Sequence, residues 1–226
     1  MVKNLLNLFF PKVCTACNGF LSDHEDLICT SCRHHLPVTN FHDDDENLVM
    51  KRLYGRVRAQ NATALLHFSK KGLVQELIHN LKYREQEDIG RVLGAWLGEE
   101  LKNTAAYRTV DAVVPVPLHP SKQRRRGYNQ VDKFAREIAA ALDASYLPKA
   151  LKREKASATQ VFKNRLNRTI GLDSKFKAGE QSLDGFSHVL LVDDIITTGA
   201  TIESCASILQ QQVRLKLSVA TMAITD

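Results

Sequence analysis

The sequence lacks any long apolar run. Nowhere in its 226 residues does a stretch approach the roughly 18–20 uninterrupted apolar residues that a membrane helix needs. The apolar start, residues 1–11, is short, is interrupted by Asn4 and Asn7, and has no small-residue cleavage site. We therefore expect a cytoplasmic protein without membrane insertion.

Other absences narrow the classes of function. Neither GxGxxG nor GxxxxGK followed by Ser or Thr occurs, so Rossmann and P-loop nucleotide sites are not supported. Aromatic residues make up 7% of the chain and lack the spacing of a base-stacking ladder. No internal repeat or low-complexity tract is present, which indicates an ordinary globular chain.

Charge is present but unevenly distributed. The formal net charge is +6, yet residues 1–46 carry more acidic than basic side chains, so the basic excess lies in the remainder. A basic balance points to phosphorylated small molecules or to nucleic acid, and a solvated basic face would have the same composition. Charge alone does not decide between these.

The chain divides into three parts. Residues 1–42 are predicted to form a small Cys-bearing module, residues 43–61, which open on an acidic run, a solvated linker, and residues 62–226 an α/β domain. Apolar runs alternate there with helical periodicity, which predicts βαβ units and a parallel sheet flanked by helices. The predicted strands are 62–68, 110–115, 188–192 and 215–224. The predicted helices are 73–83, 87–102, 131–142 and one that opens near residue 201.

The sequence also predicts structural roles for single residues in these elements. Gly90, Gly94 and Gly98 form a stripe that we interpret as close packing of a helix on the sheet. Asn129 is predicted to be an N-cap. Cys205 lies on the apolar face of a predicted helix and is expected to be a buried structural thiol.

The other four cysteines form two CxxC pairs, Cys14/Cys17 and Cys29/Cys32. Each pair can present two thiolates from one turn, and together they complete the tetrahedral sulfur set that Zn²⁺ prefers. Such a closed shell leaves no position for a reacting water, so this predicted zinc is structural. A redox dithiol and disulfides are the alternatives. The neighbouring histidines are expected to be surface residues: His24, His34 and His35.

The strongest motif follows the buried run 188–192. Asp193 and Asp194 come next, and then a stretch of small and hydroxylated residues before a helix: Thr197, Thr198, Gly199, Ala200 and Thr201. Ligands of open α/β sheets bind outside the carboxyl ends of the strands, where this stretch must lie. A tight turn at the glycine, the hydroxyls and the helix N-terminus together suit a phosphate monoester.

Asp193 and Asp194 cannot themselves bind a phosphate, because like charges repel. Paired carboxylates beside a phosphate site suit the hydroxyls of a ribose, helped by Mg²⁺. An N-terminal helix cap with incidental acids would not explain the residues that follow. A receiver or phosphatase acid pair would lack its usual companions.

Residues 189–201 resemble, position for position, the phosphoribosyl pyrophosphate signature of type I phosphoribosyltransferases. The whole chain resembles the ComF family of competence proteins, also called GntX-like, in which a CxxC…CxxC module precedes such a domain. The remaining family segments are Val114-Pro-Val-Pro-Leu-His119, Arg126-Gly-Tyr-Asn-Gln130, and Thr159-Gln160 with Arg165 and Asn167.

The resemblance implies a phosphoribosyltransferase-like domain that binds phosphoribosyl pyrophosphate with Mg²⁺. Asp193 and Asp194 would hold the ribose hydroxyls and act in catalysis, and residues 197–201 would hold the 5′-phosphate. The loop after the 110–115 strand would meet the pyrophosphate through Val116, Pro117 and Leu118. Its positive charge would come from Lys122, Arg124, Arg125 and Arg126.

Residues 149–177 are strongly basic and resemble the mobile loop that closes over the substrate in such enzymes. Charge there would neutralise a departing pyrophosphate and shield the reacting centre from water. Arg165 is the family-matched catalytic candidate, with Lys155 and Lys163 as further candidates. The same charge could instead follow a nucleic-acid backbone.

Thr197 departs from the purine-salvage pattern, which places a carboxylate there to serve the incoming base. A threonine hydroxyl is too weakly basic for that role, and Thr-Thr-Gly resembles orotate-type enzymes, whose nucleophile arrives ionised. The acceptor therefore needs no base, or the base lies elsewhere, or the domain binds without transferring.

Two functions follow. One is phosphoribosyl transfer with release of pyrophosphate, in a DNA-uptake pathway implied by the family. The other is a non-catalytic adaptor that binds single-stranded DNA and competence proteins, with the sugar-phosphate as a ligand or signal.

Overall fold

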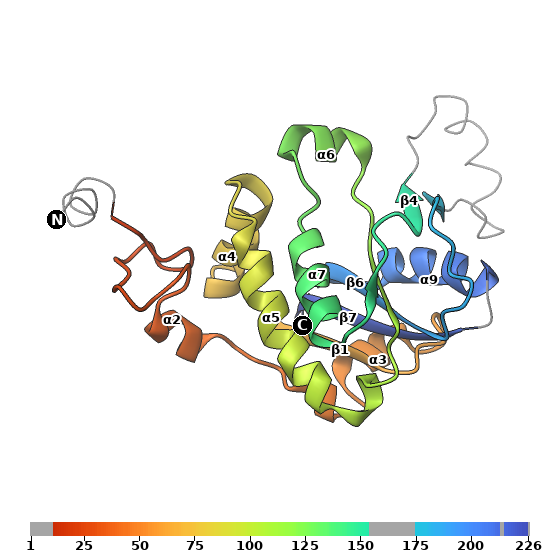
Figure 1. Ribbon diagram of the computed structural model, residues 1–226. Helices are drawn as coiled ribbons and strands as arrows, with labels where there is room; N and C mark the ends of the chain where they lie inside the picture. Colours follow the sequence, from red (N-terminus) through yellow and green to blue (C-terminus); the bar gives the residue numbers. More distant parts are fainter. Residues whose placement is uncertain (1–10, 154–174, 213–214, 226) are drawn as a thin grey trace.

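The computed structural model describes residues 11–153, 175–212 and 215–225 (Figure 1). Its centre is a five-stranded sheet of order β1-β7-β6-β2-β3 in which every neighbouring pair is parallel. The strands are β1 (Ala62–Phe68), β2 (Ala112–Pro115), β3 (Ser145–Tyr146), β6 (His188–Ile196) and β7 (Lys216–Thr225). This confirms the predicted α/β class with a parallel sheet.

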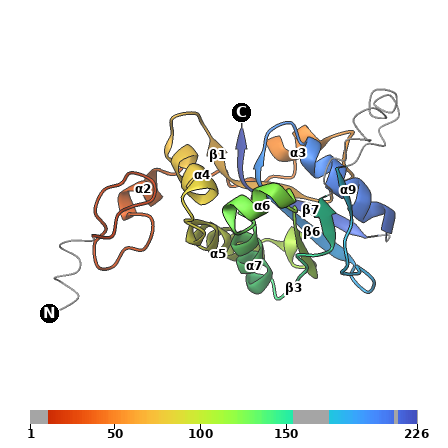
Figure 2. The same ribbon diagram turned by 90° about the horizontal axis from the view of Figure 1, so that it is seen from above.

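Helices cover both faces of the sheet (Figures 1 and 2). One face carries α4 (Leu73–Tyr83), α5 (Asp88–Asn103) and α7 (Asp132–Ala141). The other carries α3 (Leu48–Leu53), α9 (Ala200–Gln212) and an antiparallel pair, β4 (Leu151–Arg153) and β5 (Phe176–Ala178). Strand β6 is therefore buried on both sides, which explains its apolar run without polar alternation.

The helix α4 buries the apolar stripe that its periodicity predicts. Val74, Leu77, Ile78 and Leu81 recur three and four residues apart and are each at most 4% exposed. Because this stripe packs into the core, the C-terminal turn of α4 is held in a fixed position beside the sheet. This turn carries Lys82, which belongs to the candidate site.

The glycine stripe of α5 packs on a helix, α7, and not on the sheet as the sequence analysis expected. A Cβ added at Gly94 would lie 2.5 Å from the carbonyl oxygen of Phe134, and one added at Gly98 would lie 2.8 Å from the Cβ of Ala141. Small residues at these positions let the two backbones approach closely. The periodicity gave the spacing but could not identify the partner.

The basic loop expected after β2 contains a short helix, α6 (Pro120–Arg126). His119 caps it by accepting a hydrogen bond from the Ser121 N–H at 3.2 Å, Pro120 occupies its first turn, and Gly127 ends it at φ 83°. These are the usual start and stop residues of a helix. The arginines of residues 124–126 form its last turn.

Two predicted boundaries are also corrected. The strand β6 continues through Asp193 and Asp194 to Ile196 instead of ending before the acids. Asn129 does not cap α7, whose N-cap is Val131 without a side-chain cap. The Asn129 amide instead donates to the Val116 carbonyl at 3.0 Å and holds the loop after β2.

The stretch 43–61 is not solvated throughout. Its acids, residues 43–46, are exposed, but α3 follows directly and buries Val49 and Leu53. Asn47 caps α3 by accepting from the Val49 N–H at 2.9 Å, and it donates to the Ala62 carbonyl at 2.8 Å. Hydrogen bonds that sequence periodicity does not reveal thus tie this stretch to β1.

The Cys-bearing segment includes α2 (Thr30–His35) and lies beside α4 and α5, on the opposite side of the molecule from α9 (Figures 1 and 2). The other elements within the described ranges are two short 3-10 turns, η1 (Phe41–Asp43) and η2 (Ala105–Tyr107). No helix among the described residues has both the length and the apolar character required to cross a bilayer.

Candidate functional site

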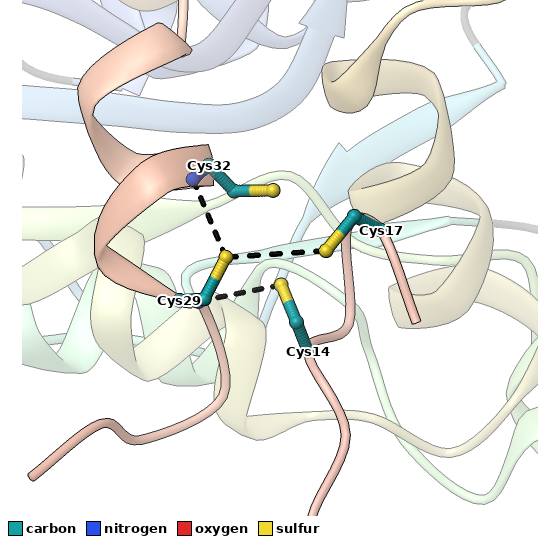
Figure 3. A group of neighbouring side chains, drawn as sticks. All are labelled: Cys14, Cys17, Cys29 and Cys32. Carbon is teal, nitrogen blue, oxygen red and sulfur yellow. Dashed lines mark hydrogen bonds between the residues drawn. The ribbon is translucent and has the colours of Figure 1, made fainter. Parts of the chain in front are cut away.

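The four cysteines of the two CxxC pairs converge at one point (Figure 3). Their sulfur atoms all lie within 4.8 Å of one another, and the Sγ atoms of Cys17 and Cys29 are 3.9 Å apart. A tetrahedral zinc with Zn–S bonds of about 2.3 Å would place its sulfur ligands about 3.8 Å apart. The cluster therefore fits a zinc ion, and all four cysteines are free thiols.

Backbone N–H groups point at these sulfur atoms, as thiolate ligands require. Cys14 Sγ accepts from the N–H groups of Cys29 at 3.3 Å and Ala16 at 3.4 Å, and Cys17 Sγ accepts from Gly19 at 3.4 Å. Burial opposes ionisation of Cys14, but these donors outweigh it and lower the pKa of Cys14 to about 7. The site can hold a metal such as zinc.

The neighbouring histidines and the fifth cysteine take no part in this cluster. His24, His34 and His35 are exposed, as predicted, and lie outside the set of close sulfur ligands. Cys205 is fully buried on α9, where burial raises the pKa of its thiol, so the prediction of a buried thiol is confirmed.

The Cys-bearing segment docks on the helical layer through both apolar packing and polar contacts, and its buried side chains, Ile28 and Leu36 among them, join the core of that layer. The Asn80 amide, on α4, donates to the Thr15 carbonyl at 2.6 Å, next to Cys14. Arg91 on α5 pairs with Asp26 at 3.0 Å. Asn80 is only 5% exposed, so its hydrogen bond is shielded from water.

A second set of polar side chains gathers at the carboxyl end of β6. Asp193 and Asp194, here called the acid pair, are 7% and 8% exposed. Side chains alternate along a strand, so Asp194 points into the layer of α4, α5 and α7, and Asp193 into that of α9. Two adjacent carboxylates with this little exposure require nearby cations or donors.

Asp194 has such partners from two distant segments. Lys82, at the end of α4, places its Nζ 2.6 Å from Asp194 Oδ2, and the Gln130 amide donates to the same oxygen at 2.9 Å. The other oxygen, Oδ1, accepts from the Ile195 N–H at 2.6 Å. Gln130 is in turn held by the Arg126 guanidinium, which donates to its Oε1 at 2.6 Å.

Asp193 is in a different state. Its Oδ1 accepts from the Asp194 N–H at 2.8 Å. Burial, followed by the charge of Asp194, raises the pKa of Asp193 to about 8, against the opposing effect of Lys82 and Arg153. The environment of Asp193 therefore favours its protonated form.

The residues 197–201 form a turn directly after β6 that is exposed except at the buried Gly199. Thr197, Thr198 and Thr201 are exposed, and Gly199 adopts φ 77°, a left-handed conformation that favours glycine. The 13-residue helix α9 begins at Ala200, so its N-terminus opens on this turn. Hydroxyls and a helix N-terminus are thus open to an anion.

The turn is supported from behind by α3 and the residues that follow it. A Cβ at Gly199 would lie 3.1 Å from Leu53 Cδ2. Arg56 donates from its Nε to Glu203 at 2.9 Å and from another nitrogen to the Thr198 carbonyl. The region predicted as linker therefore helps to shape the turn.

The loop after β2 reaches the same edge of the sheet. Val116 is buried and its N–H donates to the Val192 carbonyl at 2.8 Å, and Pro117 and Leu118 are half-buried. Pro117 and Leu118 line a pocket of about 440 Å³ that extends to Lys152 and Arg153. The loop thus lies beside the acid pair's strand, as a pyrophosphate contact would require.

The basic loop predicted at 149–177 is described only at its ends, β4 and β5. The predicted residues outside the described part of the chain are Arg165, Lys155, Lys163, Thr159, Gln160 and Asn167.

Three polar residues that join the site carried no assigned role in the sequence. Lys82 has no local motif, Gln130 lies in a family segment without an assigned role, and Arg56 falls in the predicted linker. Only the packing of α4, α6 and α3 brings them to β6 and the turn that follows it.

Sequence comparison finds relatives that are named as competence or DNA utilization proteins. The chain is 28% identical to Competence protein F of Haemophilus influenzae over 90% of this chain and 93% of that protein. It is 32% identical to DNA utilization protein YhgH of Escherichia coli K12 over 59% of each chain. It is 34% identical to Competence protein ComFC of Streptococcus pneumoniae over 54% of this chain and 50% of that protein.

No family model matches the chain. A solved hypoxanthine phosphoribosyltransferase from Staphylococcus aureus aligns with 64% of this chain and 69% of its own, at 16% identity and a TM-score of 0.35. That likeness is too distant to carry a conclusion, whereas the sequence relatives agree with the resemblance found in the motifs.

Proposed function

Because the chain belongs to the ComF family of competence and DNA-utilization proteins, we propose that it binds phosphoribosyl pyrophosphate and transfers the phosphoribosyl group in DNA uptake. The observation that carries this proposal is the junction of a buried acid pair with an exposed hydroxyl-bearing turn and the N-terminus of α9. All three lie at the carboxyl end of the central strand, where ligands of such sheets bind.

Each part of the ligand has a matching group. The 5′-phosphate would take N–H donors and hydroxyls of residues 197–201, and the ribose hydroxyls would donate to Asp193. The pyrophosphate would lie at the loop of Val116, Pro117 and Leu118. Lys152 and Arg153, which line the pocket beside this loop, would supply positive charge.

The reaction would break the bond between the anomeric carbon and the pyrophosphate oxygen, and the electron pair would leave with pyrophosphate. The acceptor nucleophile would bond to that carbon and lose its proton. The carboxyl oxygens of the acid pair would stabilise the positive charge that develops on the sugar. Thr197 is too weak a base, so an acceptor that is not already ionised must lose its proton to another group.

A divalent cation would have few protein ligands at the acid pair before phosphoribosyl pyrophosphate binds. The lone group of three or more potential ligands within the described segments is the cysteine cluster, and the Asp194 oxygens are already engaged. Mg²⁺ would therefore arrive on the pyrophosphate, where it neutralises charge, while Asp193 remains available to it.

We also propose that the cysteine cluster holds a structural zinc ion. Four converging sulfur atoms and the N–H donors around them support this assignment. We likewise propose that the chain divides after residues 42 and 61, and that the metal ion stabilises the fold of the first part.

A second candidate function, an adaptor for single-stranded DNA, is favoured by a pocket of about 250 Å³. Its lining combines positive charge with tyrosine rings: Lys82, Tyr83, Glu85, Arg125, Arg126 and Tyr128. The Arg126 guanidinium lies 5.1 Å from the centre of the Tyr83 ring. Cations beside exposed rings suit phosphates and bases.

Calorimetry with phosphoribosyl pyrophosphate and Mg²⁺ tests the main proposal. Thr201→Arg would fill the turn with a bulky cation and should abolish binding. Ser207→Arg adds the same charge at an exposed position further along α9 and should bind normally. Equal affinity of the Thr201→Arg variant and the unchanged protein would contradict the site.

The adaptor is tested separately. Changing Arg124, Arg125 and Arg126 to Ala should weaken binding of single-stranded DNA and flatten its salt dependence, because each phosphate contact contributes to that slope. Thr201→Arg should leave DNA binding intact. Loss of ligand binding with normal DNA binding would separate the two functions.

A further inference from the structure

Lys82 is the one residue of α4 whose charge reaches the acid pair. Its ammonium group lies 2.6 Å from Asp194 Oδ2, and the side chains are 19% and 12% exposed. The apolar stripe of α4 is buried, so the helix end that carries Lys82 is fixed by the core. The contact therefore belongs to the interior of the site and is not a surface ion pair.

Together with two hydrogen bonds, the contact takes up most of the bonding capacity of Asp194. A carboxylate has about four lone-pair directions, and three are used here, by Lys82, Gln130 and the Ile195 N–H. Oδ2 is contacted by both Lys82 and Gln130, so a metal ion held by that oxygen would have to displace one of them, whereas Oδ1 accepts only from the Ile195 N–H. The site thus contains a positive charge before any ion or ligand arrives.

We propose that Lys82 is the resident cation of the acid pair, occupying the place at Asp194 that a divalent cation would otherwise take. When a sugar-phosphate binds, the ammonium remains there and its charge faces the anionic oxygens of the ligand. This second part rests on the proposed function, whereas the first concerns the ligand-free protein alone.

The chemistry of lysine suits this role. An ammonium is a compact point charge with three donors, so it can hold Asp194 with one and turn the others to a ligand. Lys82 also lines the 250 Å³ pocket with Arg125 and Arg126, so space remains beside it. Its position in the chain, far from the motif of β6, explains why the sequence does not reveal it.

Binding of Mn²⁺ to the ligand-free protein, followed by electron paramagnetic resonance of the free ion, tests the first part. Lys82→Gln should bind Mn²⁺ at least about tenfold more tightly than the unchanged protein, because the acid pair loses its cation. Adding Asp194→Asn to Lys82→Gln should remove the gain. Equal Mn²⁺ affinity of Lys82→Gln and the unchanged protein would overturn the proposal.

Lys133→Gln is the matched control, since Lys133 pairs with Asp88 at 2.8 Å on the surface, and it should leave Mn²⁺ binding unchanged. Lys82→Arg keeps the charge and should also bind Mn²⁺ like the unchanged protein. If Lys82→Gln does not fold, Lys82→Met keeps the length of the aliphatic chain and serves as the second variant.

Calorimetry of phosphoribosyl pyrophosphate at low and high Mg²⁺ tests the second part. Lys82→Gln should lose about tenfold in affinity at low Mg²⁺ and regain most of it at high Mg²⁺. Unchanged affinity at both concentrations would overturn this part. Absence of binding by the unchanged protein would refute the proposed function and leave the Mn²⁺ result standing.

Discussion

The two candidate sites are assembled in different ways. All four sulfur atoms of the cysteine cluster come from residues 14–32, and they accept hydrogen bonds mainly from N–H groups of the same segment. The acid pair depends on Lys82, Gln130 and Arg126, which belong to separate elements packed around β6. Loss of one ligand should therefore disrupt the cysteine cluster without disturbing the rest of the protein. The acid pair, in contrast, should lose its contacts when any of the helices that support it moves.

One helix touches both sites. Asn80 of α4 binds the Thr15 carbonyl beside the cysteine cluster, and Lys82, two residues further on, binds Asp194. A local metal site and a distributed acid site are therefore connected by a single rigid element. The following experiments break or sharpen this contrast, from the largest expected effect to the smallest.

Cys29→Ser should give the largest effect, confined to one region. In small zinc modules the metal supplies roughly 10 kcal/mol or more of apparent folding free energy, so residues 11–42 should lose their structure. The sheet domain keeps the whole core on the face of α9 and most of the core on the other face, which it shares with residues 14–36, and it should remain folded. Limited proteolysis with metal analysis of the fragments checks this, and unchanged zinc content would contradict it.

Gly94→Ala should disturb the sheet domain. Its Cβ would lie 2.5 Å from the Phe134 carbonyl oxygen and 2.8 Å from the Phe134 Cα, so backbone must move. We expect a loss of about 1–3 kcal/mol in the free energy of unfolding, with zinc content unchanged.

Gly90→Ala is the control for this change, because its nearest contact, the Phe134 nitrogen, is at 3.4 Å. It should be neutral or slightly stabilising through the higher helix propensity of alanine. Chemical denaturation compares the two variants. A larger loss for Gly90→Ala would show that α5 and α7 do not pack as described.

Asp193→Asn should change how stability depends on pH. The pKa of Asp193 is raised to about 8, so the folded protein retains a proton that the unfolded chain releases near pH 4. Stability is therefore lost as the pH rises from about 4 to 8 and is level above it. The variant cannot lose this proton, so its melting temperature should improve relative to the unchanged protein over that range.

Thermal melts of both proteins between about pH 5 and 9 measure this difference. A difference in melting temperature that is constant with pH would show that Asp193 is ionised throughout. Such a result would leave Lys82 as the cation of two charged carboxylates.

Asn80→Ala should have the smallest effect. It removes one buried hydrogen bond to Thr15, worth about 0.5–1.5 kcal/mol. The Asn80 Oδ1 has no partner among the described residues, so truncation also removes an unsatisfied atom. Hydrogen exchange should show faster opening of residues 11–42 with the acid pair unaffected. Unchanged exchange of that segment would indicate that other contacts hold it.

The same contrast explains how far the sequence could be interpreted. The cysteine set and the 193–201 motif are contiguous or closely spaced, so spacing and composition predicted both, along with β1 and the parallel sheet. The packing of the Gly90, Gly94 and Gly98 stripe on α7 and the hydrogen bond from Asn47 to the Ala62 carbonyl depend on segments distant in the sequence. Periodicity shows which face of a helix is apolar, but not what covers it.

The residues around the acid pair show this limit most clearly. Lys82 ends an amphipathic helix and would pass for a solvated charge, and Arg56 falls after an acidic run that suggested a linker. Their roles arise from tertiary packing against β6 and the 197–201 turn. By contrast, Asp193 and Asp194 were identifiable because a buried strand leads directly into them.

The most direct test of the account is amide hydrogen exchange with and without phosphoribosyl pyrophosphate and Mg²⁺. Binding at the acid pair predicts new protection at residues 193–203 and 116–119, since these segments would contact the phosphate groups. Exchange at residues 14–32 should not change. Protection confined to residues 14–32, or none anywhere at saturating ligand, would contradict the assignment of the ligand site to the carboxyl end of β6.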